Sequence, residues 1–581
     1  MKKIILLNLL AFNLWAQNSN NEAFTQFLKN AFDENLKNSP LSATSIGENQ
    51  YNDQLLVEFT DSYKLKLEQV TKNTLVELGK FDRASLNENE RMSYDIFKYR
   101  AEIELETYKI KSNRIPFNQF YALPLTMAQY GSGKVVQPFK TVKDYDNWIA
   151  RAGNFPVWAD SAIIYFRKGM AENIVLPKAL VGKMVNQMRG FVKNNAAISV
   201  FWGPIQDMPS GFSAEDKNRL SQAYIQLILG KIEPTYTKLA DFLETEYIHK
   251  ASAGSGLSTL PNGKEWYANS LKQLTTTNKT ADEIYKTGLS EVKRIRKEME
   301  KVKKSVGFKG DLLAFFEHMR TDPKFYPHST QEGVLNEYRA IETKITPTLS
   351  RLFNNKPKTP FEVRATEAFR AASAAAQYNA GLADGSRPGI FYVPIIDPKT
   401  TPVRESLFIH EAIPGHHYQI MLQRENESLP QFRRYSGYTA YSEGWGLYSE
   451  SLGKELGLYT DPYQYMKALG DEIHRAIRLV VDPGLHAKNW TREQAIKYMV
   501  ENEPITEAAA TAEIERYMVL PGQATTYKIG SMFLQSMRKK YTKQLGKKFN
   551  IADFHDQILK NGSLPLAILE NNLENWAKSK K

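Results

Sequence analysis

The sequence predicts a large, mostly α-helical protein. Segments with a clear hydrophobic period repeat apolar residues every three or four positions, which is the period of an amphipathic helix. Strand-like runs are few. The chain has 581 residues, of which 42% are hydrophobic and 24% charged. It can therefore bury a sizeable core, and its length allows two to four domains or one large two-lobed fold.

Helical periodicity extends over six segments, and one run of β-type residues interrupts the pattern. The predicted helices cover residues 24–36, 214–229, 281–302, 365–378, 463–480 and 491–500. The best strand candidate covers 389–394, directly after the turn-forming residues 384–388 and shortly before a histidine cluster. We therefore expect a small β element close to the functional site.

Two loop-like stretches suggest how the chain is divided. Residues 252–263 and 275–280 are rich in glycine, serine, threonine and asparagine, which favour loops and domain boundaries. We predict an N-terminal helical region over residues 17–275 and a C-terminal helical catalytic region over 276–581, both as lobes of one fold.

The N-terminus is typical of a signal peptide. Lys2 and Lys3 precede a mostly apolar run over residues 4–16, and a polar stretch follows. This apolar run is too short to cross the ~30 Å hydrocarbon core as a helix. We expect cleavage after Ala16, export to the periplasm or the medium of a bacterium, and no stable membrane anchor afterwards. The alternative is an N-terminal helix buried in the fold.

Composition limits the chemistry that the chain can use. It contains no cysteine, which excludes disulfides, thiolate ligands and lipid attachment through cysteine, so any metal must be held by His, Asp or Glu. The net charge of +12 could attract nucleic acid. Many of the lysines, however, alternate with glutamates along predicted helices, which is typical of a solvated face, and we expect no nucleic-acid partner.

A histidine cluster carries the strongest functional signal. His410, His416 and His417 fall within eight residues, and Glu411 follows the first of them. Neutral imidazoles are good zinc ligands, and a hydrolytic zinc site uses three protein ligands and leaves one position for water. In the common zinc-protease motif the glutamate after the first histidine is the general base. We predict one zinc ion, with His410 as a ligand and Glu411 as the base.

The spacing within the cluster requires a distorted helix. On a regular helix His416 would be rotated by about 120° from His410 and His417 by about 20°, at axial separations of about 9 Å and 10.5 Å, so neither reaches the same ion directly. Pro414 has no amide hydrogen for the carbonyl of His410, and Gly415 permits unusual backbone angles. We predict a helical bulge that brings His416 to the ligand position, with His417 as the alternative.

A second helix supplies carboxylates. Glu443 and Glu450 are seven residues apart, which places them on one helix face. We predict that Glu443 is the third metal ligand and that Glu450 orients a ligand histidine through its free ring nitrogen, or else forms a plain salt bridge. Gly444 and Gly446 would let this helix approach its neighbour closely. A glycosidase pair is disfavoured, because the two backbones are about 10.5 Å apart and the histidines stay unexplained.

These motifs resemble a known family. Residues 410–419 and 442–450 are similar to the signatures of the bacterial family known as domain of unknown function 885, and the resemblance extends over most of residues 280–535. That family is similar to the Taq-type zinc carboxypeptidases and, more distantly, to angiotensin-converting enzyme and thimet oligopeptidase. The resemblance implies a two-lobed, zincin-like helical fold with zinc at the floor of a deep cleft. Those relatives have two residues between the glutamate and the second histidine where this chain has four, and pairing Gly415–His416 with the second half of their motif favours His416.

Further roles are assigned more indirectly. The resemblance implies that a tyrosine or histidine after the third ligand stabilises the oxyanion, and Tyr527 and His486 are the candidates. Residues 390–393, including Tyr392, could offer a strand edge to an extended peptide, and Arg387 could pair with a substrate carboxylate. A core strand and a solvated arginine are the alternatives.

The sequence thus predicts a zinc-dependent peptide hydrolase, similar to a carboxypeptidase or an oligopeptidase, that acts on a peptide or small amide. One alternative keeps the metal but makes the chain an amidase or esterase of a small molecule. The other is a catalytically silent, metal-binding envelope protein. No oligomeric state is predicted.

Overall fold

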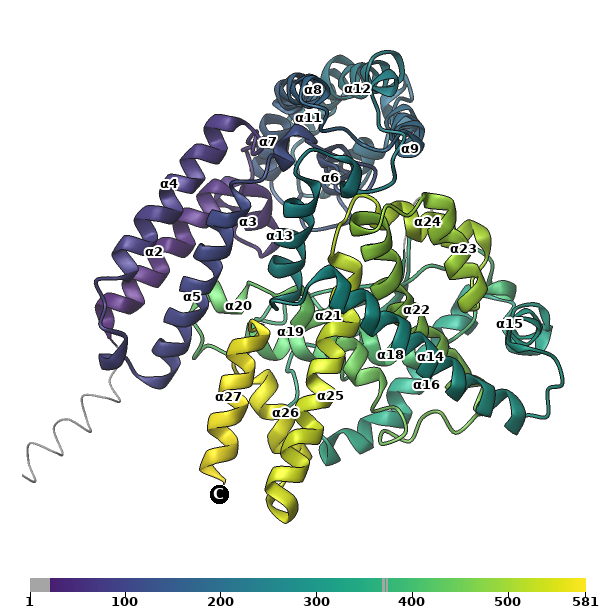
Figure 1. The fold of residues 1–581 in the computed structure, drawn as a ribbon. Helices are drawn as coiled ribbons and strands as arrows, with labels where there is room; N and C mark the ends of the chain where they lie inside the picture. The colour runs from purple at the N-terminus through teal and green to yellow at the C-terminus, as the bar shows by residue number, and fades with distance from the viewer. Residues whose placement is uncertain (1–20, 368–370, 372–374, 581) are drawn as a thin grey trace, which may run out of the picture. The chain divides into compact units, whose positions relative to one another are not determined.

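A computed structural model describes residues 21–367, 371 and 375–580 of the chain (Figure 1). It confirms a mostly α-helical protein with one small sheet. The predicted signal peptide at 1–16 lies outside the described residues. Two compact units divide the chain: an N-terminal unit of Asn20–Ser85 and Lys98–Gly263, and a C-terminal unit that contains Leu86–Phe97 and the chain from Lys264 onward. The packing therefore separates the units at 263/264, where the sequence suggested 275/276.

The N-terminal unit is entirely helical among its described elements. Its helices are α2 (Glu22–Asn38), α3 (Pro40–Ser45), α4 (Asp61–Leu78), the second half of α5 (Glu88–Thr107), α6 (Leu123–Gly131), α7 (Val142–Gly153), α8 (Phe155–Ala171), α9 (Lys178–Gly190), α10 (Gly203–Gln206), α11 (Ala214–Leu227) and α12 (Glu233–Thr245). Its core is rich in aromatic side chains, including Trp148, Phe166 and Tyr236. Fully buried Arg151 is accommodated there because Thr44, Gln137 and backbone carbonyls accept its hydrogen bonds.

The C-terminal unit carries all the predicted site residues. Its helices are the first half of α5, α13 (Gly263–Thr275), α14 (Ala281–Ser305), α15 (Leu312–Thr321), α16 (Gln331–Ile345), α18 (Glu405–Glu411), α19 (His416–Glu425), α20 (Gln431–Arg434), α21 (Thr439–Glu450), α22 (Pro462–Ala487), α23 (Arg492–Asn502), α24 (Glu507–Tyr517), α25 (Thr526–Leu545), α26 (Ile551–Leu559) and α27 (Leu566–Ser579). The α14–α22 and α21–α25 pairs form its most extensive helix contacts. None of the described helices is both long and apolar enough to cross a membrane.

The sheet has three strands in the order β1-β3-β2, namely β1 (Phe361–Ala365), β3 (Gly389–Val393) and β2 (Gln377–Asn379). β1 runs parallel to β3, and β2 runs antiparallel to it. The predicted strand at 389–394 is therefore confirmed as a strand, but the idea that 390–393 offers an edge is wrong. β3 is the middle strand, so neighbouring strands already use the hydrogen-bonding groups on both of its sides.

Five of the six predicted helices correspond to α2, α11, α14, α22 and α23 within a few residues. The helix predicted at 365–378 is wrong at both ends, because residue 365 ends β1 and residues 377–379 form β2; most of the residues between lie outside the described residues. The apolar strand β3 needs partners on both sides, and that tertiary demand overrides the helical period of the flanking residues.

Helices α21 and α25 touch backbone to backbone at two glycines. A Cβ atom on Gly530 would lie 1.8 Å from the carbonyl oxygen of Ala440, and one on Gly444 would lie 2.5 Å from the Cα of Gly530. No side chain fits at either position. This contact brings the first turn of α25, with Tyr527, next to the part of α21 that carries Glu443.

We predict that Gly530→Ala forces α21 and α25 apart and lowers the free energy of unfolding by about 1–3 kcal/mol, the usual cost of overpacking. Urea denaturation measures the change. Gly470→Ala on α22 is the matched control, because its Cβ would meet only Pro504 at an ordinary 3.4 Å. Equal stability of the two variants would contradict the close contact.

A buried histidine links α26 to the rest of the C-terminal unit. His555 is fully buried; its Nδ1 donates to the Leu352 carbonyl at 2.8 Å, and its Nε2 accepts from the Tyr448 hydroxyl at 2.8 Å. Burial lowers the pKa of His555 from an ordinary 6.5 to about 3. Both ring nitrogens are satisfied only in the neutral form.

We therefore predict an acid-sensitive contribution to stability. Between pH 6.5 and 3 the unfolded chain binds a proton at this position and the folded chain does not, so stability falls as pH falls through this window. His555→Gln, which can keep both hydrogen bonds, should reduce the loss of unfolding free energy between pH 7 and pH 5 by on the order of 2 kcal/mol. Urea titrations of metal-free protein at the two pH values check this, and an unchanged difference would refute it.

Candidate metal centre

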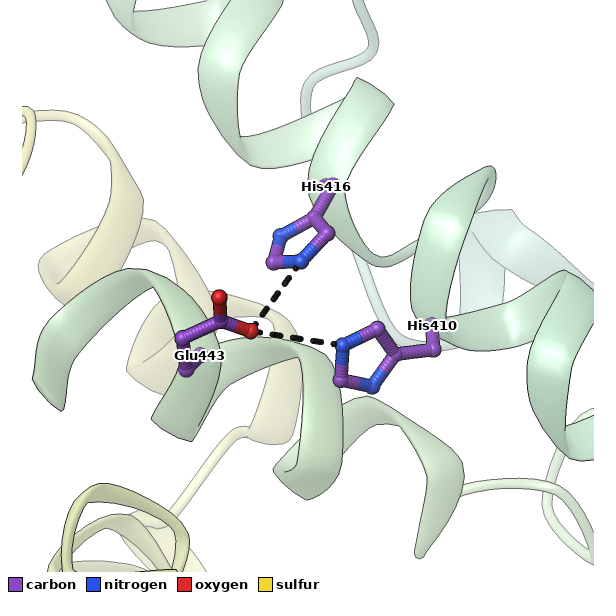
Figure 2. Close-up of side chains that lie close together, drawn as sticks. All are labelled: His410, His416 and Glu443. Atoms are coloured by element: carbon purple, nitrogen blue, oxygen red, sulfur yellow. Dashed lines mark ion pairs between the residues drawn. The ribbon is translucent and has the colours of Figure 1, made fainter. Parts of the chain in front are cut away.

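Three side chains from three helices converge on one point of the C-terminal unit (Figure 2). His410 ends α18, His416 begins α19, and Glu443 lies in α21; one ligand atom from each lies within 4.8 Å of the other two. The Oε2 atom of Glu443 is 3.5 Å from Nε2 of His410 and 3.4 Å from Nε2 of His416. These are the three residues that the sequence suggested as metal ligands.

The helix break between His410 and His416 makes this convergence possible. α18 ends at Glu411 and α19 starts at His416, so the chain is interrupted over four residues where the sequence predicted a bulge in one helix. Gly415 passes so close to the end of α18 that a Cβ would lie 2.0 Å from the His410 carbonyl oxygen. The Nε1 of Trp445 donates to the Pro414 carbonyl at 2.8 Å and ties the break to α21. The two imidazole rings meet at 4.7 Å, nearly perpendicular.

Helix α21 shapes the surroundings of His410 in two further ways. A Cβ on Gly446 would lie 2.7 Å from the His410 ring, so only glycine leaves room for the imidazole. One turn further, Glu450 Oε1 is 2.7 Å from Nδ1 of His410. This carboxylate fixes the ring and its tautomer and directs Nε2 toward Glu443, an arrangement that raises the basicity of a ligand histidine.

The donor set fits a zinc ion. Two imidazoles and one carboxylate are the protein ligands of many hydrolytic zinc sites, and ligands at ~2.1 Å in a tetrahedron lie about 3.4 Å apart. The separations of 3.4 and 3.5 Å between Glu443 and the two histidines match that edge.

The charges at the site favour a cation. Burial alone lowers the pKa of His410, but Glu443 and Glu450 outweigh this effect and raise the pKa to about 10. Despite its burial, Glu443 has a pKa well below its usual range because both imidazoles face it. A cation is therefore favoured at this point, either as a proton or as a metal ion.

The predicted base lies beside these ligands. Glu411 is the last residue of α18 and is 7% exposed. Burial raises the pKa of Glu411, and the neighbouring imidazoles of His410 and His416 oppose the rise. A carboxylate in such a position can accept and return a proton.

Tyr527 also lies at the site. Its ring is stacked on that of His410 at 6.3 Å, and its hydroxyl accepts a hydrogen bond from Gln523 at 3.4 Å. Burial, together with the negative charge of Glu443, raises the pKa of Tyr527. The phenol thus keeps its proton and can act as a donor.

His417 points elsewhere. Its Nδ1 is 2.9 Å from the hydroxyl of Tyr378, and its ring packs on Phe361 at 4.8 Å, so it contacts the strands β1 and β2. Burial lowers the pKa of His417 to about 4. Of the two adjacent histidines, His416 is the one that the structure places beside His410 and Glu443.

The other predicted residues are not gathered with the ligands. His486 is fully buried, its Nε2 donates to the Tyr517 carbonyl, and its ring lies against Tyr267. Arg387 lies in the loop before β3 and donates to the Ala380 carbonyl at 3.4 Å. Tyr392 is 7% exposed within the middle strand. Tyr392 thus fits the alternative of a core strand, whereas Arg387 is half-buried and not a solvated side chain.

Sequence reasoning did not single out the arginines near Tyr527. The guanidinium of Arg478 lies 4.7 Å from the centre of the Tyr527 ring, and that of Arg475 lies 5.9 Å from it. Both come from α22, in a stretch whose other residues between 476 and 481 are apolar. Charged side chains three apart in an otherwise apolar run could have revealed them.

We predict that His416→Ala loses bound zinc while His417→Gln keeps it, because only the first change removes a ligand atom. Metal content after zinc loading and dialysis measures this. Full zinc binding by His416→Ala would contradict the arrangement.

We also predict that Glu450→Gln weakens zinc affinity by about 10–100-fold, the usual cost of losing a partner of a ligand histidine.

The family model described as "Bacterial protein of unknown function (DUF885)" matches residues 40–573. A solved structure from Colwellia psychrerythraea, described as a putative lipoprotein, aligns with a TM-score of 0.87 at 28% identity over 96% of this chain and 99% of its own. Another, from Shewanella oneidensis and described as a putative lipoprotein of unknown function, shares the fold with a TM-score of 0.71 at 20% identity over 94% and 99% of the two chains. No curated protein matches the sequence.

Proposed function

We propose that this chain, which belongs to the bacterial DUF885 family, is a zinc-dependent peptide hydrolase. The observation that carries the proposal is the convergence of His410, His416 and Glu443, with ligand atoms within 4.8 Å of one another and Glu411 beside them. Such a ligand set with an adjacent carboxylate is what metal-assisted hydrolysis of an amide requires.

Each residue has a distinct role in this proposal. His410, His416 and Glu443 would hold the ion, and Glu450 keeps His410 in the orientation and tautomer that a ligand needs. When bound, zinc supplies Lewis acidity and a water molecule that loses its proton near neutral pH. Glu411 accepts a proton from the attacking water and gives it to the departing amine. The Tyr527 hydroxyl donates a hydrogen bond to the oxygen of the attacked carbonyl.

Amide hydrolysis is preferred over a purely structural metal site because the site keeps a base and a donor beyond the three ligands. A structural zinc site is closed by four protein ligands. Here three protein ligands converge among the described residues, and Glu411 and Tyr527, which suit proton transfer and oxyanion stabilisation, lie beside them. The likeness to the Taq-type zinc carboxypeptidases and to angiotensin-converting enzyme, inferred from the sequence motifs, supports the same reaction.

Export is part of the proposal. The N-terminal pattern over residues 1–16 is typical of a signal peptide. The structural neighbours from Colwellia and Shewanella are described as lipoproteins, a class of exported proteins. This chain has no cysteine to carry a lipid, so we propose release into the periplasm or the medium.

We predict that Glu411→Gln lowers peptide hydrolysis by about 10²–10⁴-fold and keeps bound zinc, because the change removes the base and spares the ligands. Turnover of a mixed peptide library and metal content measure the two effects. Glu405→Gln, at the other end of α18, serves as the control.

The same library separates the alternatives. Hydrolysis of small amides or esters without cleavage of peptides would replace the peptidase by an amidase or esterase. Stoichiometric zinc without turnover of any substrate would favour a catalytically silent metal-binding protein. Full activity of Glu411→Gln would refute the proton role.

A further inference from the structure

A pocket of about 500 Å³ lies between the end of α21 and the second half of α25. The two helices touch at Gly444 and Gly530, and the pocket begins about one turn beyond that contact. Its volume is within the range of small-molecule sites, which is about 300–1,000 Å³. The residues that line it all belong to the C-terminal unit: Tyr448, Ser451, Gln535, Arg538, Lys539, Thr542 and Lys543.

The lining residues of α25 share one face of that helix. Residues 535, 538, 539, 542 and 543 follow the spacing i, i+3, i+4, i+7, i+8, which places five side chains on one stripe. All five are polar, three are cations, and none of the described residues that line the pocket is acidic. Lys540, between them in the sequence, lies on another face and pairs with Glu570 at 3.3 Å. The pocket thus concentrates positive charge locally.

One carboxylate holds one of the three cations. Nη2 of Arg538 donates to Glu455 at 2.7 Å, which fixes the guanidinium, and 29% of the Arg538 side chain stays exposed. Lys539 and Lys543 are exposed and form no ion pair with any described residue. Three cations therefore face the hollow against a single carboxylate. Like charges around one hollow repel each other and favour an anion among them.

The donors in the wall suit a phosphate group. A phosphate monoester has three terminal oxygens and a charge of about −1.5 to −2 at neutral pH. Lysine binds it as a point charge, and arginine binds it through a fork of N–H groups. Thr542 and Gln535 are exposed and add neutral donors, whereas Tyr448 adds none because its hydroxyl donates to His555. A carboxylate has less charge and fewer oxygens to match this set.

We propose that the pocket between α21 and α25 binds a phosphate monoester, carried by a soluble sugar or by the headgroup of a lipid. Lys539 and Lys543 neutralise the phosphate, and Arg538 donates hydrogen bonds to it. The rest of the volume accommodates the group to which the phosphate is attached. The inference does not depend on the proposed peptidase function, because the pocket uses neither the metal ligands nor Glu411 and Tyr527.

The test compares ligands of similar size and different charge. Calorimetry on zinc-loaded and on metal-free protein compares glucose 6-phosphate, glucuronate and glucose, which carry a phosphate, a carboxylate and no charge. We expect glucose 6-phosphate to bind roughly tenfold or more tightly than glucuronate, because the phosphate has more charge and more acceptors. Glucose should not bind. The same preference in both metal states separates the pocket from ligation of phosphate by zinc.

Charge-matched variants locate the binding. Lys539→Gln/Lys543→Gln removes two cations of the wall and should lower the affinity for glucose 6-phosphate by roughly tenfold or more. Lys540→Gln/Lys547→Gln lowers the net charge equally from positions outside the wall and should leave the affinity nearly unchanged. All four lysines are exposed, and thermal unfolding checks that both variants are folded.

Sedimentation with phosphatidylcholine vesicles, with and without phosphatidate, distinguishes the two sources of phosphate. Capture only by phosphatidate vesicles, lost in Lys539→Gln/Lys543→Gln and kept in the control, assigns the headgroup of a lipid. Binding of glucose 6-phosphate without capture by vesicles assigns a soluble phosphate.

Four results would overturn the inference. Equal losses in the two double variants would mean that only the general charge of the protein attracts phosphate. Equal affinities for glucose 6-phosphate and glucuronate would remove the choice of phosphate. A preference that disappears with the metal would place the ligand on zinc. Absence of measurable binding to glucose 6-phosphate and to both kinds of vesicle would leave the pocket without this ligand.

Discussion

The candidate centre depends on the close approach of α21 to its neighbours. Gly444 allows backbone contact with α25 at Gly530, and Gly446 leaves room for the His410 ring of α18. A methyl group at any of these positions would separate the helices by more than the tolerance of a metal site, whose bond lengths are fixed within tenths of an ångström. Glu443, which lies on the same helix, is thereby brought to His410 on one side and to Tyr527 on the other. The glycines lower the intrinsic helix stability of α21, by about 1 kcal/mol each, and the packing they permit offsets that loss.

Electrostatics within the buried site follow from this packing. Glu411, Glu443 and Glu450 lie around the two imidazoles, and three carboxylates in a poorly solvated place strongly favour a cation among them. Arg475 and Arg478 face Tyr527 next to these groups, and the carboxylates of Asp471, Glu450 and Glu513 lie within 4 Å of the two arginines.

Much of the fold was predictable from local sequence, because amphipathic helices are local structures. The periods at 281–302 and 463–480 correspond to α14 and α22, whose apolar sides pack on each other. Strands depend on partners that are distant in sequence, and here the prediction was weaker. The predictions of a helix at 365–378 and of a free strand edge at 390–393 were wrong because β3 pairs with both β1 and β2. No local sequence pattern encodes this pairing.

The sequence by itself determined the chemistry that is available. It shows His410 and His416, the adjacent Glu411, and the two carboxylates of Glu443 and Glu450 seven residues apart. The absence of cysteine restricts any metal to His, Asp and Glu ligands. Only the tertiary structure decided between His416 and His417, because the break at residues 412–415 sets the direction in which each side chain points. It likewise separated Tyr527 from His486 and brought the arginines of α22 next to Tyr527. Side chains from separate helices meet only through packing, and packing is a property of the whole unit.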